Sequence, residues 1–212
     1  MWSSEVTNMI ITGIWETLYM TLVSTLVGYV IGLPMGIILT VSDKDGIKPN
    51  AVLYKILDVI ANIVRSVPFI ILLVLLIPFT RLVVGKSYGS TATIVPLVIA
   101  AAPYIARMVE SSLKEVDAGV IEAARSMGAS NFTIITKVML VEARTSLLVG
   151  ATITLGTILG YSAMSGAVGG GGLGAIAIRY GYTRWQTDIM IVTVILLIIF
   201  CLLYTSPSPR DA

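Results

Sequence analysis

The sequence predicts an all-α protein, a polytopic membrane bundle of about five transmembrane helices with a short helix in its longest cytoplasmic loop. The 212 residues are 56% hydrophobic and only 12% charged, with a mean hydropathy of +0.93, whereas soluble domains carry about 25% charged residues. Five apolar runs approach the ~20 residues that a helix needs to cross a bilayer. No long polar block interrupts them, so we expect one membrane domain over residues 1–204.

The expected spans cover residues 9–41, 67–84, 92–109, 146–163 and 189–203. The first is interrupted by Gly28, Gly32, Pro34 and Gly36, and its early part, with Glu16, is expected along the outer interface. Neither a basic segment nor a small-residue cleavage site accompanies this span, so we expect it to be retained rather than removed as a signal peptide.

Lysine and arginine are unevenly divided between the two sides of these spans. One side carries nine of them: Lys44, Lys48, Lys55, Arg107, Lys114, Arg125, Lys137, Arg144 and Arg210. The other side carries four: Arg81, Lys86, Arg179 and Arg184. Because basic residues stay on the cytoplasmic side, this division predicts an N-terminus outside the cell and a cytoplasmic C-terminus.

The composition also excludes several kinds of chemistry. The chain has no histidine, and its single cysteine, Cys201, lies in an apolar run. A disulfide, a Cys/His metal site and histidine-based catalysis within one chain are therefore excluded. The net charge of +2 gives no indication of a nucleic-acid partner. We expect no catalytic residue, no metal and no cofactor in this chain.

Two motifs resemble nucleotide-binding loops without their context. Gly169, Gly171 and Gly174 fit GxGxxG, but no strand precedes them. Gly85–Ser87 reads as the end of a phosphate-binding loop, yet Thr80 stands where that loop needs a glycine. Neither motif predicts nucleotide binding.

The loop at about residues 110–145 carries a pattern typical of two short helices. Apolar side chains recur at helical spacing at Val116, Val120, Ile121, Ala124 and Met127. Asp117 and Glu122 lie toward the N-terminal side, where they favour the helix dipole, and Gly128 predicts the stop. A second helical stretch is expected at residues 131–141, and Glu110 and Lys114 are spaced as an i,i+4 pair.

The first of these helices is suited to contact a soluble partner. Ala123 and Ala124 would allow close approach to a groove, and Glu122 could anchor the helix by a hydrogen bond or ion pair. The alternative is an amphipathic helix that lies on the membrane surface without a partner. Its position in the longest cytoplasmic loop, before the penultimate span, favours the partner.

Several segments carry a resemblance to a known family. They read RSVPFIILL, APYIARMVESSLKEVD, EAARSMGAS, KVMLVEAR and ITLGTILGYSAMSGAVGGGGLGAIAIRYGYTRWQTD. Together, over residues 9–203, they resemble the membrane subunit of methionine importers, a branch of the ATP-binding-cassette importer permeases, and Glu122 to Gly128 matches its EAA coupling motif. Val141 departs from the pattern, because many members place a proline there.

The resemblance implies a permease subunit for amino-acid transport in the bacterial inner membrane. It implies a homodimer, two copies of a cytoplasmic ATPase, and an external substrate-binding lipoprotein. ATP would be hydrolysed by the partner chain, so this chain would be no enzyme. The residues placed in the ATPase groove would be Glu122, Ala123, Ala124, Met127 and Gly128. The substrate would be methionine or, alternatively, another small amino acid or an anion.

The segment 156–174 predicts the transport pathway. It holds eight glycines, together with Tyr161, Ser162, Met164 and Ser165. Small residues let membrane helices approach closely, and the flexible Met164 is suited to close a gate. The alternative for Ser162 and Met164 is simple packing between helices.

Two further basic features leave alternatives open. Arg65 either snorkels to the membrane interface or forms an ion pair at the cytoplasmic end, with Asp58, Glu122 or the ATPase surface. The outer segment from Arg179 to Trp185 is either an aromatic interface belt or part of a docking face for the binding protein.

Two other function classes find little support. An intramembrane enzyme would need a nucleophile and base, which the spans do not offer. A secondary transporter would need intramembrane ionisable relays, and the third and fourth spans contain almost no carboxylates. Residues 205–212 read as an atypical tail, which we expect to be a truncation or assembly artefact.

Overall fold

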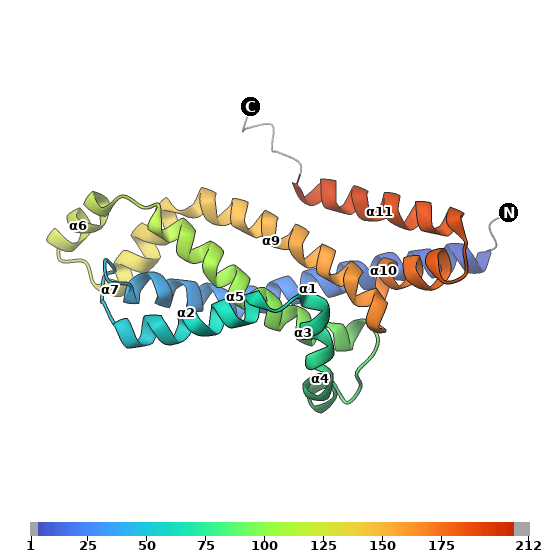
Figure 1. The fold of residues 1–212 in the computed structure, drawn as a ribbon. Coiled ribbons are helices and arrows are strands. Elements are labelled where there is room, and N and C mark those ends of the chain that lie inside the picture. The colour runs from blue at the N-terminus through green and yellow to red at the C-terminus, as the bar shows by residue number, and fades with distance from the viewer. Residues whose placement is uncertain (1–3, 206–212) are drawn as a thin grey trace. The chain divides into compact units, whose positions relative to one another are not determined.

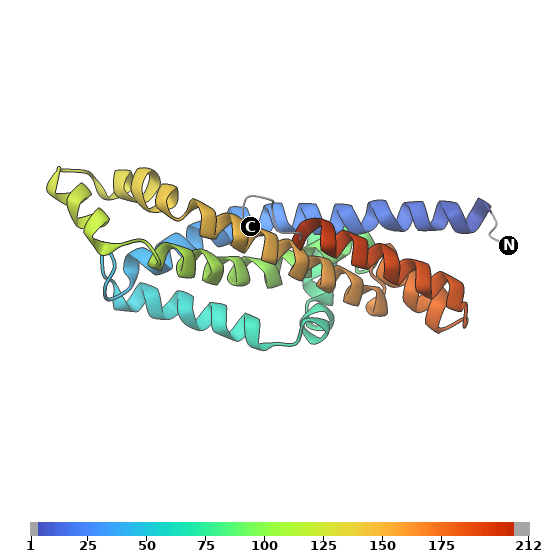
Figure 2. The ribbon, with the colours of Figure 1, turned by 90° about the horizontal axis from the view of Figure 1, so that it is seen from above.

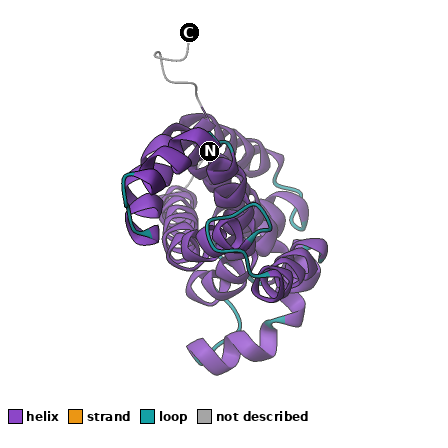
Figure 3. Cartoon of the chain, turned by 90° about the vertical axis from the view of Figure 1, so that its left-hand side faces the viewer, coloured by secondary structure: helices purple, strands orange, loops and turns teal. Residues whose placement is uncertain are grey.

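The computed structural model describes residues 4–205, and the predicted atypical tail lies almost wholly outside them, at residues 206–212. The all-α prediction is confirmed, because the described residues form helices and connecting loops without a strand (Figure 3).

The helices follow one another as labelled in Figure 1. In chain order they are α1 (Ser4–Ser42), α2 (Ala51–Ser66), α3 (Phe69–Leu75), α4 (Ile77–Val84), α5 (Ser90–Lys114), α6 (Ala118–Ser126), α7 (Asn131–Thr133), the π-helix η1 (Ile134–Met139), α8 (Leu140–Glu142), α9 (Arg144–Ser165), the 3₁₀-helix η2 (Gly166–Val168), α10 (Gly172–Ile176), the π-helix η3 (Ala177–Tyr182) and α11 (Thr187–Thr205).

The long helices match the expected apolar runs. Three stretches of the described chain are long and apolar enough to cross a membrane: α1, α5 and the stretch Arg144–Tyr182. A fourth arises if α2 and α3, which meet at 102°, count as one broken span. The apolar helix α11 is shorter. The count of five spans therefore stays a prediction.

The predicted interruption of the first span is wrong, because α1 runs unbroken for 39 residues with Pro34 inside it. Its glycines serve packing instead. A Cβ on Gly32 would lie 2.6 Å from the carbonyl oxygen of Ala102 in α5, and one on Gly36 would lie 2.6 Å from that of Ala106. The stripe of glycines lets the backbones of α1 and α5 approach closely.

The second expected span, 67–84, is also corrected, because it forms two helices that meet at Leu76. Pro68 caps α3, and Pro78 lies in the first turn of α4. Proline is tolerated at these positions because the backbone N–H groups there have no partner within the helix. Gly85 ends α4 with a φ of +80°.

The fold divides into two compact units, each built from separated segments. Of the described residues, the first takes in 4–26, Val67–Ala100 and 155–205. Its buried core includes Met20, Leu97, Ile158 and Leu173. The second consists of Val27–Ser66 and Ala101–Thr154. The prediction of one membrane domain over residues 1–204 stays a prediction, because compact units of this kind are not separate domains of the sequence.

In the second unit, α5 packs on the later part of α1 and on α2 (Figures 1 and 2). Its core includes Leu39, Ile105, Val109, Leu113 and Ile134, each at most 1% exposed. Helix α6 lies at the end of this unit, beyond the ends of α2 and α5 (Figure 1).

Candidate functional site

Helix α6 has a defined cap at each end. The Asp117 carboxylate accepts a hydrogen bond from the backbone N–H of Gly119 at 2.7 Å. At the other end Gly128 has a φ of +80°. Its N–H bonds the carbonyl of Arg125, and the N–H of Ala129 bonds that of Ala124. This pair of bonds is a Schellman motif, which confirms the stop predicted at Gly128.

The predicted coupling residues do not all face the same way. Glu122, Ala123, Met127 and Gly128 are exposed, and Met127 is 81% exposed. Ala124 is only 5% exposed, so the expectation that it offers surface to a partner is not met. It lies on the inner side of α6, which packs against η1. The small side chain therefore serves contact within this chain.

The second helical stretch, predicted at 131–141, is confirmed as α7, η1 and α8. The Ser130 hydroxyl caps it by accepting from the N–H of Thr133 at 3.2 Å. Phe132, 74% exposed, stands on its first turn near Met127 in sequence. Phe132 was not among the residues predicted for this site, although an aromatic residue between the polar Asn131 and Thr133 was a usable signal.

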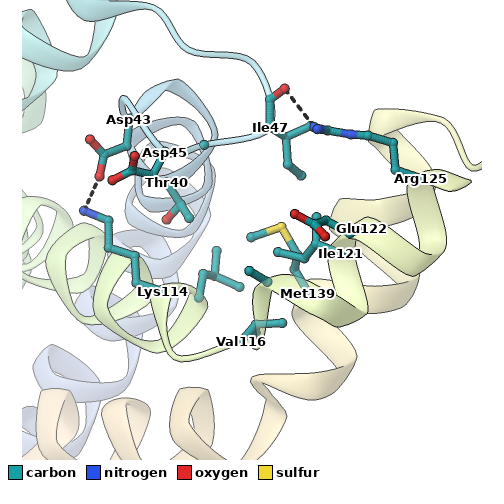
Figure 4. A pocket seen from close by; sticks show the side chains of 13 residues that line it. Thr40, Asp43, Asp45, Ile47, Lys114, Val116, Ile121, Glu122, Arg125 and Met139 are labelled. Atoms are coloured by element: carbon teal, nitrogen blue, oxygen red, sulfur yellow. Dashed lines mark hydrogen bonds and ion pairs between the residues drawn. The ribbon is translucent and has the colours of Figure 1, made fainter.

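A cavity of about 420 Å³ separates α6 from the end of α1 (Figure 4). Its lining comes from the end of α1 and the following loop, the end of α5, and α6. Glu122 and Arg125 line it from α6, and Asp43, Asp45 and Lys114 line it from the other side.

Two polar contacts tie the loop after α1 to its neighbours. Arg125 Nη2 donates to the carbonyl oxygen of Ile47 at 3.1 Å, and Lys114 Nζ lies 2.7 Å from Asp43 Oδ2 (Figure 4). The first links the loop to α6 and the second links it to α5. A displacement of α6 would therefore also move the loop that joins the end of α1 to the start of α2.

A chain of ion pairs continues from Lys114 along α5. Lys114 Nζ lies 2.8 Å from Glu110 Oε1, which confirms the predicted i,i+4 pair. Arg107 bridges Glu110, at 2.7 Å, and Asp58 of α2. The Tyr54 hydroxyl donates to Glu110 at 3.2 Å. The network joins α2, α5 and the loop after α1 at this end of the unit.

The Lys114 ammonium holds the pKa of Asp43 below its usual range, chiefly by a hydrogen bond. A lowered carboxyl pKa stabilises the fold above the unfolded pKa of about 3.9, and this contribution is lost as pH falls through the folded pKa. We expect Asp43→Asn to lower the melting temperature at pH 7, and the difference from wild type to shrink as the pH falls below about 4. Thermal unfolding in detergent between pH 3 and 8 measures it, and a difference as large at pH 3 as at pH 7 would contradict it.

Arg65 differs from the prediction. Its guanidinium lies 5.9 Å from the centre of the Tyr104 ring, a cation–π arrangement. Among the described residues Arg65 forms no ion pair, and its expected partner Asp58 pairs with Arg107 instead. The prediction of an ion pair between Arg65 and a carboxylate of this chain is therefore wrong. The ATPase surface stays a predicted partner of Arg65.

The predicted pathway residues divide into two kinds. Ser162 and Ser165 are at most 1% exposed, and their hydroxyls donate to the carbonyls of Leu159 and Ser162. Both are buried, which for Ser162 agrees with the packing alternative considered from sequence and for Ser165 differs from the predicted pathway role. Met164 is 49% exposed, and Tyr161 stacks on Phe69 of α3 at 4.5 Å between ring centres.

The segment from Arg179 to Trp185 combines a cation–π pair with two exposed aromatic rings. Arg184 lies 4.6 Å from the centre of the Tyr180 ring. Tyr182 is 70% and Trp185 is 85% exposed, and Trp185 has a φ of +58°. Both an interface belt and a docking face remain predictions for this segment.

Comparison with known proteins decides the family. Residues 32–206 match the family described as the binding-protein-dependent transport system inner membrane component. This chain belongs to that family. It is therefore a multi-pass membrane protein of a transport system.

Relatives and solved structures agree with this membership. The chain is 48% identical to the probable D-methionine transport system permease protein MetI of Vibrio cholerae, over 93% of this chain and 88% of that protein. It is 53% identical to the D-methionine transport system permease protein MetI of Escherichia coli K12, over 74% and 73%.

Among solved structures, a chain of the MetNI methionine ABC transporter in inward-facing conformations superposes with a TM-score of 0.93 at 51% identity. The match covers 96% of this inner membrane component and 94% of that chain. An amino acid ABC transporter solved with histidines matches at a TM-score of 0.77 and 23% identity, which shows a shared fold.

Proposed function

We propose that this inner membrane component is the permease subunit of an ATP-driven methionine importer. It would act as a homodimer with two copies of a cytoplasmic ATPase and would receive substrate from an external binding lipoprotein. The names of the MetI relatives, at 48% and 53% identity, support the substrate. The methionine transporter superposed at a TM-score of 0.93 supports the partners.

The capped helix α6 carries this proposal. It presents Glu122, Ala123 and Met127 on one exposed surface between two fixed ends. The Arg125 contact ties it to the loop after α1, and η1 and α8 connect it to α9. A helix held in this way acts as a lever, because a push on its surface moves attached elements instead of bending the helix.

Closure of the ATPase would swing α6 and open the pathway toward the binding protein. Met164 and Tyr161 are the proposed pathway residues, while Ser162 and Ser165 serve packing around them. We place no cofactor in this chain, since ATP would be bound and hydrolysed by the partner.

Uptake of labelled methionine tests the proposal. The chain is expressed with its ATPase and binding protein in a strain that lacks its own methionine importer. Both enantiomers are supplied, with other small amino acids and small anions as competitors. Methionine uptake that depends on all three components is expected, and uptake of a different substrate alone would favour the alternative specificity.

The proposed orientation has its own test. In a Cys201→Ser background without the ATPase, which would otherwise cover this surface, Met127→Cys is expected to react with a membrane-impermeant maleimide in inverted vesicles and not in intact cells. Tyr182→Cys is the matched control and should react with the opposite preference. Labelling of Met127→Cys in intact cells would place α6 outside and overturn the coupling proposal.

A further inference from the structure

A carboxylate lies within the apolar helix α1, where ionisable residues are costly and point to a function. Glu16 is half-buried and stands about three turns from the start of this 39-residue helix. Sequence reasoning placed it along the outer interface without a role. In the structure its side chain meets the first unit's glycine-rich turn.

Glu16 and its neighbour Thr17 cap the N-terminus of α10, which is 156 residues away in sequence. Glu16 Oε2 accepts a hydrogen bond from the backbone N–H of Gly172 at 2.6 Å. Thr17 Oγ1 accepts one from the N–H of Leu173 at 2.9 Å. These N–H groups have no partner within α10, so the side chains of α1 satisfy them. A charged acceptor makes the first bond a strong one.

The glycines of this turn are required by the close approach of α1. A Cβ on Gly171 would lie 2.6 Å from Glu16 Oε2. Gly172 has a φ of +78°, and a Cβ there would lie 2.5 Å from Thr17 Oγ1. A side chain at either position would therefore clash with α1.

The same turn is bonded to the end of α9. The N–H of Gly170 donates to the carbonyl of Ser165 at 2.9 Å, and the N–H of Gly89, before α5, donates to the carbonyl of Gly169 at 2.9 Å. Met164, the exposed candidate gate residue, directly precedes Ser165. The contact of Glu16 thus fixes the segment that ends in the gate side chain.

We propose that Glu16 is a positioning residue of the transport pathway: it holds the break between α9 and α10 against α1 and so sets the position of Met164. The inference rests on the proposed transport function. It assigns Glu16 the role of a hydrogen-bond acceptor for the backbone of the turn, rather than a role in contacting substrate.

Three substitutions test this role in the assembled transporter. Glu16→Leu removes the acceptor, and we expect uptake per ATP hydrolysed to fall about tenfold, the change that corresponds to loss of one charge-assisted hydrogen bond. Glu16→Gln keeps an oxygen at the same reach and is expected to retain at least about half of the wild-type ratio. Thr17→Val removes the second acceptor at nearly constant volume and should give an intermediate ratio. Glu5→Leu, an exposed carboxylate on the same helix, is the matched control.

The position of residue 164 is measured independently of uptake, by the reactivity of a cysteine placed there. In a Cys201→Ser background, the rate of maleimide labelling of Met164→Cys is compared with and without Glu16→Leu. We expect the rate to change with Glu16→Leu and to return toward the original with Glu16→Gln. An unchanged labelling rate, or Glu16→Gln as impaired as Glu16→Leu, would overturn the positioning role. If wild type itself showed no ATP-dependent uptake, the proposed function would fail instead. The labelling comparison would still decide whether Glu16 sets the position of Met164.

Discussion

Glu122→Lys is expected to abolish methionine uptake while leaving the chain folded in the membrane. Glu122 is exposed and forms no ion pair within residues 4–205, so reversal of its charge breaks no ion pair in that part of the chain. A reversed charge within a protein interface costs several kcal/mol, so we expect uptake and co-purification with the ATPase to fall at least about tenfold. Co-purification from detergent and vesicle uptake measure the effect.

The matched control is Glu115→Lys. Glu115 is exposed three residues before α6 and carries the same charge. It should keep both the complex and uptake. If Glu122→Lys retained the complex while the control also did, α6 would not be the surface that holds the ATPase.

A change at Gly128 tests the shape of the same helix instead of its charge. Valine at a φ of +80° costs at least about 1–2 kcal/mol and would disrupt the Schellman motif. Gly128→Val should therefore lose the complex as well. Gly128→Asn should keep most of it, because asparagine tolerates this backbone conformation.

Arg107→Ala is expected to give the largest loss of stability in the second unit. The Arg107 side chain is 18% exposed, and its partners Glu110 and Asp58 are 6% and 30% exposed. Removing the guanidinium leaves the carboxylates of Glu110 and Asp58 near each other without the cation that both contact. Breaking such a pair costs about 3 kcal/mol, the lower end of the range for buried pairs, since Asp58 reaches water.

Thermal unfolding of the purified complex in detergent measures this loss. Arg107→Lys should recover only part of the stability, because an ammonium cannot match the fork that reaches both carboxylates. Arg107→Ala combined with Asp58→Asn should be more stable than Arg107→Ala alone, since one uncompensated charge is removed. Arg144→Ala, an exposed arginine at the start of α9, is the matched control. Equal melting temperatures for Arg107→Ala and this control would contradict the role of the network.

The all-helical class and the ends of α6 could be predicted from the sequence. Asp117 and Gly128 form hydrogen bonds with backbone groups two and three residues away, so the local sequence indicates where the helix begins and ends. The same locality explains why the Glu110–Lys114 pair was predicted correctly. Helix patterns could not show that Pro34 lies inside a continuous helix, because the packing of Gly32 and Gly36 against α5 stabilises α1 through that position.

The direction of individual side chains was less predictable than the motif that contains them. Glu122 and Ala123 were expected on the surface and lie there, whereas Ala124 faces inward. An alanine fits both places, so only the packing of α6 against η1 decides between them. The hydroxyls of Ser162 and Ser165 could similarly line a pathway or bond their own helix, and they do the latter.

The sequence by itself determined an all-helical membrane protein, the helix α6 and the absence of histidine chemistry, because composition, periodicity and local hydrogen bonds suffice for these. The transport family followed from the resemblance of its motifs to known permeases. Only the tertiary structure decided which distant residues meet: Asp58 with Arg107, 49 positions away, and Glu16 with Gly172, 156 positions away. Such pairs depend on how helices pack, and packing arises from many weak contacts over whole helix faces.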